Sequence, residues 1–314
     1  MPARDIISPR VEGRVSLTDG RRLGFAEWGR PGGHTVLWFH GTPGARRQVP
    51  PRAREMAEEQ GLRIVGIERP GVGASTPHLY DSYADWADDI RQLADQLGID
   101  RFAAVGLSGG GPYVLACASA LPDRVVAGAV LGGVAPMHGE DAVDGATAAV
   151  RLLDRFSGVV TAARNPFGLG LGVVMQLLTP FSSRAFDLAT GLFPEGDRRV
   201  FERPEMKAMF IDDLARGSRS GLRSLLYDAI LMTRPWGFAL REITVPIRFW
   251  HGDADPIVPL AHARHLAAAV SDSELRIRPG ESHLGGLDAA EEVLDTIVDI
   301  WIGRSQSSSR PAHS

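Results

Sequence analysis

The sequence has a single cysteine, no excess of basic residues and no long uninterrupted apolar run, and each shortage excludes a class of protein. One cysteine in 314 residues can form neither an internal disulfide nor a cysteine-based metal site. We therefore expect a reducing compartment, the cytoplasm, and no cofactor. The 34 Lys and Arg against 38 Asp and Glu give a formal net charge of −4, so a nucleic-acid partner is not expected.

One uncharged stretch, between Arg164 and Arg184, has to be compared with the length that a membrane span requires. Its apolar part, 167–178, contains three glycines and is flanked by Pro166 and Pro180. A spanning helix needs about 20 mainly apolar residues. We therefore expect no membrane span, and a buried or pocket-lining helix instead. The first residues mix charges and prolines without an apolar block, so we expect no signal peptide either.

Short apolar strands alternate with helices along most of the chain. Strands that are apolar throughout and separated by helices predict a parallel sheet that is covered on both faces. The fold class predicted here is α/β, with a mostly parallel eight-stranded sheet. The expected strands are 11–17, 23–28, 36–39, 63–67, 102–105, 125–131, 246–250 and 274–278, and the expected helices are 44–60, 81–97, 109–120, 259–270 and 286–302.

About a hundred residues, 136–240, interrupt this alternation with helix-like, glycine-broken sequence. Such a segment is too long for a loop inside a compact domain. We expect a core formed by 1–135 and 241–303, a helical cap formed by 136–240, and a disordered serine-rich tail, 304–314. The cap should lie over the carboxyl end of the sheet, where ligands bind in open α/β folds.

The sequence Gly106-Leu107-Ser108-Gly109-Gly110 fits the pattern G-x-S-x-G and lies between an expected strand and an expected helix. This strand–turn–helix setting is the one that a nucleophile elbow requires. Glycines at 106 and 110 leave space where a Cβ would collide with neighbouring backbone. A glycine-rich helix start would carry the same letters, but the flanking elements favour Ser108 as a nucleophile.

A serine nucleophile needs a base, and a histidine near the C-terminus is expected to supply it. His283 lies in the loop between the last expected strand and the last expected helix, at the same sheet edge as Ser108. We expect two other histidines, His262 and His265, to be solvated, since they lie three apart on a helix with no carboxylate pair.

An acidic residue must orient the imidazole of the base and stabilise its charged form. The segment 251–259 follows the strand 246–250 and offers two aspartates, Asp253 and Asp255. One of them can be a turn or cap residue while the other is the acid. The loop after the preceding strand, 132–136, contains no acid.

The tetrahedral intermediate of an acyl transfer needs hydrogen-bond donors for its oxyanion. One is the backbone N–H of Gly109, directly after the nucleophile, and the second should come from the loop after the strand 36–39. That loop is His40-Gly41-Thr42-Pro43-Gly44. We predict Thr42 as the second donor, although a plain strand-to-helix turn is compatible with the same residues.

These motifs together resemble the α/β-hydrolase superfamily, in the form with a helical cap found in esterases and proline iminopeptidases. The resemblance implies an α/β-hydrolase fold. In the family pattern G-x-x-D-x-x-V-P the acid is the aspartate three residues after the glycine, which ranks Asp255 above Asp253. Glu68 departs from the aspartate usual there; this is not a catalytic position, and we expect Glu68 to shape its loop. The matching segments are 40–44, 68–75, 106–110, 252–259 and 282–283.

The resemblance also separates this chain from some members of the superfamily. Epoxide hydrolases and haloalkane dehalogenases use an aspartate nucleophile, and Ser108 argues against both. Proline iminopeptidases carry H-G-G-P-G and G-x-S-W-G, where this chain has Thr42 and Gly109. They also hold the substrate amine with glutamates of the cap. Three glutamates could serve that purpose or be solvated: Glu195, Glu202 and Glu205.

The function predicted from the sequence is a cofactor-independent serine hydrolase that acts on a small-molecule ester or other acyl substrate, most simply a carboxylesterase. Other acyl chemistry on the same fold stays open: an aminopeptidase, a carbon–carbon hydrolase, a thioesterase or an acyltransferase. A non-catalytic binding protein with the same fold also stays open. Apolar residues of the expected cap favour an apolar substrate group, although they could equally pack the cap on the core: Phe156, Phe167, Leu171, Val174, Met175 and Leu178.

Overall fold

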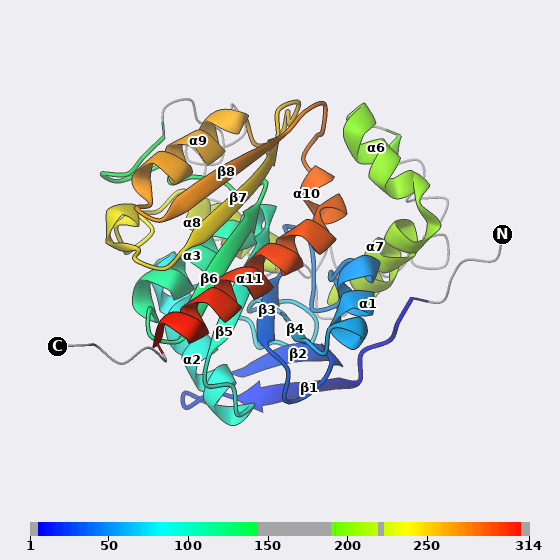
Figure 1. Cartoon of the computed structure of the whole chain (residues 1–314), viewed down its shortest axis with the longest axis vertical. Coiled ribbons are helices and arrows are strands. Elements are labelled where there is room, and N and C mark those ends of the chain that lie inside the picture. The colour runs from blue at the N-terminus through cyan, green and yellow to red at the C-terminus, as the bar shows by residue number, and fades with distance from the viewer. Residues whose placement is uncertain (1–5, 144–189, 192, 219–222, 309–314) are drawn as a thin grey trace.

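The computed structural model describes residues 6–143, 190–191, 193–218 and 223–308 (Figure 1). Its centre is one sheet of eight strands in the order β1-β2-β4-β3-β5-β6-β7-β8. The pairs β1–β2 and β2–β4 are antiparallel and all others are parallel, which confirms the predicted mostly parallel sheet of eight strands. The strands are β1 Val11–Ser16, β2 Arg22–Gly29, β3 Thr35–Phe39, β4 Arg63–Ile67, β5 Phe102–Leu107, β6 Val125–Leu131, β7 Ile247–Gly252 and β8 Ser273–Arg278.

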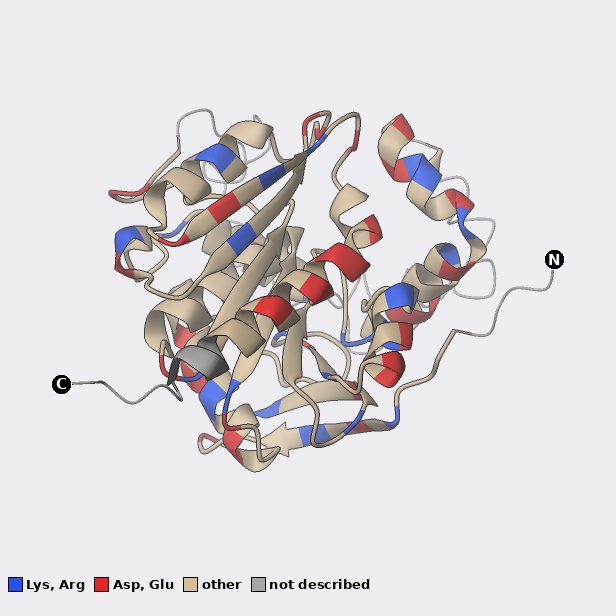
Figure 2. Ribbon diagram, in the orientation of Figure 1, with Lys and Arg blue, Asp and Glu red and all other residues tan. Residues whose placement is uncertain are grey.

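Helices cover both faces of the sheet, and the central strands are buried from end to end. Along β3, Leu37 and Phe39 pack in the apolar cluster that contains α2 and α3, while Val36 and Trp38 pack in the cluster that contains α1 and α11. Successive side chains of a strand point to opposite faces, so a strand that is covered on both sides must be apolar throughout. Figure 2 shows the consequence, since charged residues lie mainly on the surrounding helices and, within the sheet, toward its two sides, on β1, β2, β7 and β8.

The helices of the core follow the predicted alternation, but the first of them begins later than predicted. The chain does not become helical at residue 44 as predicted, because 44–49 form a turn and α1 begins at Pro51. Residues that precede a proline are kept out of the helical region, and two prolines in series, Pro50 and Pro51, fix the start. The core helices are α1 Pro51–Glu59, η1 Tyr83–Asp85, α2 Trp86–Gln96, η2 Ser108–Gly110, α3 Gly111–Ala120, η5 Leu240–Glu242, α9 Leu260–Ala269, α10 Gly285–Asp288 and α11 Ala290–Ser308.

Three further helices lie in the segment for which a cap is expected: α6 Glu195–Glu202, α7 Pro204–Gly217 and α8 Arg223–Met232. In the described part of 136–240 the structure assigns no strand before η5. The uncharged run 165–183 lies outside the described residues, and so do all six apolar residues of the expected cap, Phe156 included. Among the helices that are described, none is both long and apolar enough to cross a bilayer. The last helix, α11, extends to Ser308, six residues beyond its predicted end.

The topology brings the predicted site residues to one edge of the sheet. The parallel strands β3, β5, β7 and β8 all end at this edge, and the loop after each carries one candidate: Thr42, Ser108, Asp255 and His283 in that order. Ligands of open α/β folds bind outside the carboxyl ends of the strands. The sheet therefore gathers at one edge residues that are up to 241 positions apart in the sequence.

Candidate active site

The tight strand–turn–helix segment that the sequence predicts around Ser108 lies between β5 and α3. Ser108 has a φ of 50°, in the left-handed region that non-glycine residues rarely occupy. The turn is tight enough that a Cβ built on Gly106 would lie 2.5 Å from the carbonyl oxygen of Gly110. A Cβ on Gly110 would lie 2.4 Å from the carbonyl oxygen of Phe39. Both glycines are therefore required by backbone packing, and Ser108 is held in a strained conformation above the sheet edge.

Ser108, His283 and Asp255 form a hydrogen-bonded series. His283 Nε2 lies 2.7 Å from Ser108 Oγ, and His283 Nδ1 lies 2.8 Å from Asp255 Oδ2. A carboxylate accepts hydrogen bonds, so the proton of the neutral imidazole belongs on Nδ1 and the Nε2 lone pair faces the serine hydroxyl. His283 and Asp255 are buried, while Ser108 is half-buried at a cavity. The arrangement can remove a proton from Ser108.

Asp255, and not Asp253, is the aspartate that contacts His283. Its Oδ1 accepts hydrogen bonds from the N–H groups of Ile257 and Val258, at 2.8 and 2.9 Å. Burial alone would raise the pKa of Asp255, but hydrogen bonds from His251, His283 and the backbone hold this pKa well below its usual value. Asp253 is exposed and accepts from Gly280 N at 2.7 Å, which is the turn role that the sequence left open.

Thr42 and Gly109, the two predicted oxyanion donors, lie against each other. A Cβ built on Gly109 would be 2.4 Å from Thr42 Oγ1 and 3.2 Å from Thr42 Cβ. The side chain of Thr42 thus fills the space that a side chain at 109 would need. A residue larger than glycine at 109 is incompatible with this position of Thr42.

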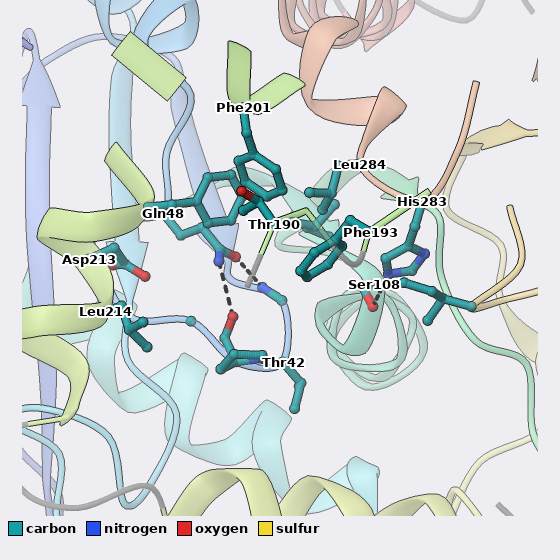
Figure 3. A pocket seen from close by; sticks show the side chains of 16 residues that line it. Thr42, Gln48, Ser108, Thr190, Phe193, Phe201, Asp213, Leu214, His283 and Leu284 are labelled. Atoms are coloured by element: carbon teal, nitrogen blue, oxygen red, sulfur yellow. Dashed lines mark hydrogen bonds between the residues drawn. The ribbon is translucent and has the colours of Figure 1, made fainter. Parts of the chain in front are cut away.

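A cavity of about 420 Å³ opens beside Ser108. Figure 3 shows Ser108 and His283 at one end, Asp213 and Leu214 toward the other, and aromatic rings between them. The rings of Phe193 and Phe201, and of Phe201 and Phe210, meet edge to face with centroids 5.6 and 5.1 Å apart. Cavities of this size and lining hold small, largely apolar ligands. The aromatic residues come from α6, α7 and the segment before α6.

Each of the three described helices of the inserted segment places one buried aspartate on a loop of the site. Asp197 of α6 accepts from Leu284 N, next to His283, at 2.7 Å. Asp213 of α7 accepts from Ala45 N at 2.8 Å and Arg47 N at 2.9 Å.

Asp228 of α8 accepts from the hydroxyl of Thr42 at 2.6 Å. Sequence reasoning missed all three aspartates, because no motif distinguishes them from solvated acids. The nearest available signal was their position in an insertion that had to dock on the site.

Burial raises the pKa of Asp213 to about 7, although its two hydrogen bonds from backbone N–H groups act in the opposite direction. The same loop is held from within by Gln48. Its Oε1 accepts from Gly41 N at 2.6 Å and its Nε2 donates to the carbonyl of Pro43 at 3.1 Å. The loop after β3 is therefore fixed on two sides, by its own glutamine and by α7.

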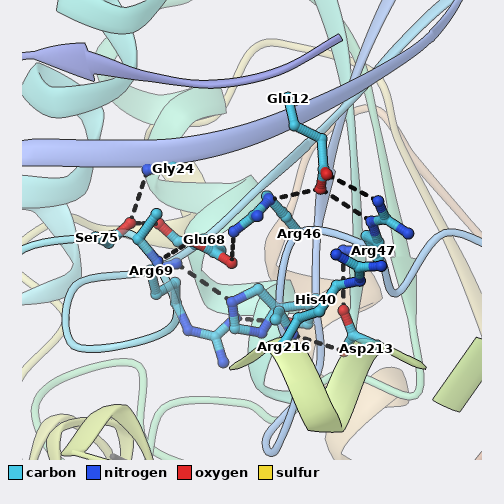
Figure 4. A network of polar contacts seen from close by, with 12 residues as sticks. Glu12, Gly24, His40, Arg46, Arg47, Glu68, Arg69, Ser75, Asp213 and Arg216 are labelled. Carbon is cyan, nitrogen blue, oxygen red and sulfur yellow. Dashed lines mark hydrogen bonds and ion pairs between the residues drawn. The ribbon is translucent and has the colours of Figure 1, made fainter. Parts of the chain in front are cut away.

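Glu68, the departure from the family pattern, is a buried structural residue (Figure 4). It pairs with Arg46 and accepts from Ala74 N at 2.6 Å. A Cβ on Gly24 or Gly73 would lie 2.2 or 2.1 Å from its carboxylate oxygens, so two glycines make room for the longer acid. Burial raises the pKa of Glu68 and the charge of Arg46 opposes this. The expectation that Glu68 shapes its loop agrees with these contacts.

The expectation of solvated histidines on α9 is wrong. His262 is 2% exposed, and its Nδ1 accepts from Ala135 N at 3.1 Å. His265 is half-buried, with Nε2 2.8 Å from the carbonyl of Asp141. The residues 135–141 cover this face of α9, which the sequence could not show because the contact spans more than 120 positions.

Comparison with known proteins supports the architecture. A family model described as the alpha/beta hydrolase fold matches residues 34–290. This chain belongs to the α/β-hydrolase fold family. A solved structure of a thermophilic esterase from Thermogutta terrifontis superposes with a TM-score of 0.65 over 94% of this chain and 98% of that one. Its sequence identity of 21% makes this a likeness of fold.

Curated relatives of this α/β hydrolase differ in activity. It is 27% identical to a non-heme haloperoxidase of Rhodococcus erythropolis over 279 residues, 86% of this chain and 92% of the relative. It is also 27% identical to a bifunctional esterase/perhydrolase of Acinetobacter calcoaceticus, again over 86% of this chain and 92% of the relative. A proline iminopeptidase of Arabidopsis thaliana is 33% identical over 131 residues, 41% of this chain and 34% of that protein.

Proposed function

We propose that this α/β hydrolase cleaves small carboxylic esters through an acyl-enzyme on Ser108. The observation that carries the proposal is the hydrogen-bonded series from Ser108 through His283 to Asp255 at the mouth of an apolar cavity. A serine, a base and an orienting acid in this order are the constellation of serine hydrolases. The resemblance over nearly the full length to an esterase/perhydrolase supports the same reading.

In the proposed mechanism, His283 Nε2 takes the proton of Ser108 as Oγ attacks the acyl carbon. The N–H groups of Gly109 and Thr42 stabilise the oxyanion of the tetrahedral intermediate. The imidazolium then gives its proton to the oxygen of the departing alcohol. The alcohol dissociates, and the acyl group stays bound to Ser108 as the acyl-enzyme. Water, deprotonated by His283, attacks the acyl carbon of the acyl-enzyme. As the bond from this carbon to Ser108 Oγ breaks, His283 returns the proton to Oγ and the carboxylic acid is released. Asp255 keeps the imidazole in the required tautomer throughout.

An aminopeptidase of the proline iminopeptidase type is less well supported. The match to such an enzyme covers about two fifths of this chain. The cap glutamates that could hold a substrate amine do not line the cavity, and Glu195 and Glu202 are exposed. The tryptophan of the pattern G-x-S-W-G could not replace Gly109 here, because Thr42 occupies its space.

The experiment compares wild type and Ser108→Ala on p-nitrophenyl esters of rising acyl length and on aminoacyl p-nitroanilides. We expect ester turnover by wild type, loss of about 10⁶ in kcat in the variant, and an unchanged circular dichroism spectrum. A fluorophosphonate probe should label wild type at Ser108. Preference for the anilides would support the aminopeptidase, and absence of both labelling and turnover would support a non-catalytic binding protein.

A further inference from the structure

Arg69 and Asp228 form a buried ion pair beside the loop that follows β3. Each side chain is 2% exposed. Arg69 Nη2 lies 2.7 Å from Asp228 Oδ2, and Arg69 Nε lies 3.2 Å from Asp228 Oδ1, so the contact is bidentate. Burial alone would lower the pKa of Arg69, but the charge and hydrogen bonds of Asp228, together with Tyr113 and Tyr83, raise this pKa above its usual value. Arg69 follows β4 and Asp228 lies on α8, so the pair connects the core to the inserted segment.

The remaining donors of Arg69 hold the backbone on which the proposed oxyanion donor lies. Figure 4 shows Arg69 beside His40, the first residue of this loop. Nη1 donates to the carbonyl of His40, and Nη2 donates to the carbonyl of Gly41 at 3.0 Å. The His40 ring adds a contact of 2.8 Å from Nδ1 to the Gly41 carbonyl. In a trans peptide the C=O and the following N–H point in opposite directions. Holding the Gly41 carbonyl toward Arg69 therefore turns the N–H of Thr42 away from it.

The Thr42 side chain is held by the same pair. Its hydroxyl donates to Asp228 Oδ2 at 2.6 Å and accepts from Arg69 Nη2 at 2.8 Å. The two hydrogens of Nη2 are thus shared among Asp228 Oδ2, the Gly41 carbonyl and the Thr42 hydroxyl. Tyr113 of α3 adds a hydrogen bond of 2.8 Å to the other oxygen of Asp228. The N–H of Thr42 takes part in no hydrogen bond found among the described residues. A donor that is fixed in direction and without a partner is what an oxyanion needs.

We propose that the Arg69–Asp228 pair is the positioning element of the oxyanion site, and that α8 thereby controls the direction of the Thr42 N–H. The proposal rests on the ester hydrolysis proposed above. A buried ion pair often adds little net stability compared with apolar residues of similar volume. Here the pair orients the loop after β3, because it holds two carbonyl groups and one hydroxyl group of this loop at the same time.

The test uses two variants that disturb this arrangement and one that preserves it. Asp228→Asn weakens the ion pair, and Thr42→Val removes the hydroxyl while the ion pair stays. Thr42→Ser keeps the hydroxyl. The matched control is Asp89→Asn on α2, because Asp89 is also buried, bidentate with Arg21 at 2.6 and 2.7 Å and hydrogen-bonded by a tyrosine, Tyr80.

The readouts are kcat, KM and the inhibition constant of a trifluoromethyl ketone, which forms a tetrahedral oxyanion on the serine. We expect Asp228→Asn and Thr42→Val to lower kcat at least about tenfold and to weaken the ketone by a similar factor. KM should change less than about threefold. Asp89→Asn should stay within about threefold of wild type in both kcat and ketone affinity, and Thr42→Ser, which keeps the hydroxyl, should retain more of both than Thr42→Val does. Thr42→Val keeps the test available if Asp228→Asn does not fold.

The outcomes separate the two proposals. If wild type neither reacts with a fluorophosphonate nor binds the ketone, the ester hydrolase assignment fails and the positioning role falls with it. If wild type does both but Thr42→Val and a folded Asp228→Asn bind the ketone as tightly as wild type, the positioning role alone is overturned. An equal kcat loss in Asp89→Asn would also overturn it, because the effect would then be one of stability.

Discussion

The contact between Thr42 and position 109 allows one substitution to be worked out in detail, Gly109→Ala. The new Cβ would start 2.4 Å from Thr42 Oγ1. An ordinary van der Waals contact begins near 3.4 Å, so the two groups must separate by about 1 Å. Thr42 cannot rotate away freely, because its hydroxyl is bonded to both Asp228 and Arg69.

The displacement should damage catalysis more than stability. Overpacking of a tight site costs about 1–3 kcal/mol, which the fold should survive. A shift of about 1 Å in a positioned group costs about 10² in rate, and loss of an oxyanion donor costs about 10² to 10³. We therefore expect Gly109→Ala to lower kcat/KM at least about 100-fold while the protein stays folded.

The assay is a double-mutant cycle with Thr42→Gly on p-nitrophenyl butyrate. Thr42→Gly alone loses the anchoring hydroxyl and should lower kcat/KM. When Thr42→Gly is already present, Gly109→Ala should lower kcat/KM by no more than about threefold, because the clash has gone. The difference between this loss and the loss of about 100-fold in the presence of Thr42 corresponds to a coupling energy of about 2 kcal/mol. Gly32→Ala is the matched control, because a Cβ at Gly32 meets nothing within 4 Å.

Two results would refute this reasoning. Full activity of Gly109→Ala with Thr42 present would mean that Thr42 moves freely and is not held by the ion pair. An equal loss from Gly109→Ala with and without Thr42→Gly would mean that the clash lies elsewhere in the elbow.

Three further predictions concern the acid, the loop and the cavity. Asp255→Asn should lower kcat by about 10⁴ and Asp253→Asn by less than about threefold; the reverse order in steady-state kinetics would reject Asp255 as the acid. Burial raises the pKa of Asp213 from 3.8 to about 7, so its contribution to stability is fully present below pH 4 and is lost as the pH rises through 7, by about 4 kcal/mol. Asp213→Asn should remove that pH dependence from thermal unfolding curves, and an unchanged dependence would contradict the raised pKa. Phe210→Ala should raise kcat/KM for longer acyl chains by about fourfold per added methylene, because Phe210 lines the cavity. The control Phe238→Ala, outside the cavity, should leave the dependence of kcat/KM on chain length unchanged. The same dependence in Phe210→Ala and wild type would show that Phe210 does not contact the acyl group.

The sequence by itself determined the parallel sheet, the elbow and the sheet edge at which the candidate residues meet. These are local signals, because a buried strand is apolar throughout and a tight strand–helix turn demands glycine at 106 and 110. Parallel strands end at a common edge, so the loops with Ser108, Asp255 and His283 had to converge. The family pattern ranked Asp255 above Asp253 before any contact was known.

Only the tertiary structure determined which acidic residues of the inserted segment are buried against the loops of the site. Thr42 and Asp228 are 186 positions apart, and nothing local distinguishes Asp228 or Asp213 from a solvated aspartate. Their burial depends on how α7 and α8 dock on the loop after β3, which is a long-range outcome of packing. The same holds for His262, whose burial requires residues 135–141 to cover α9. Sequence patterns record periodicity and turn chemistry, whereas the partner of a buried charge is set by the fold.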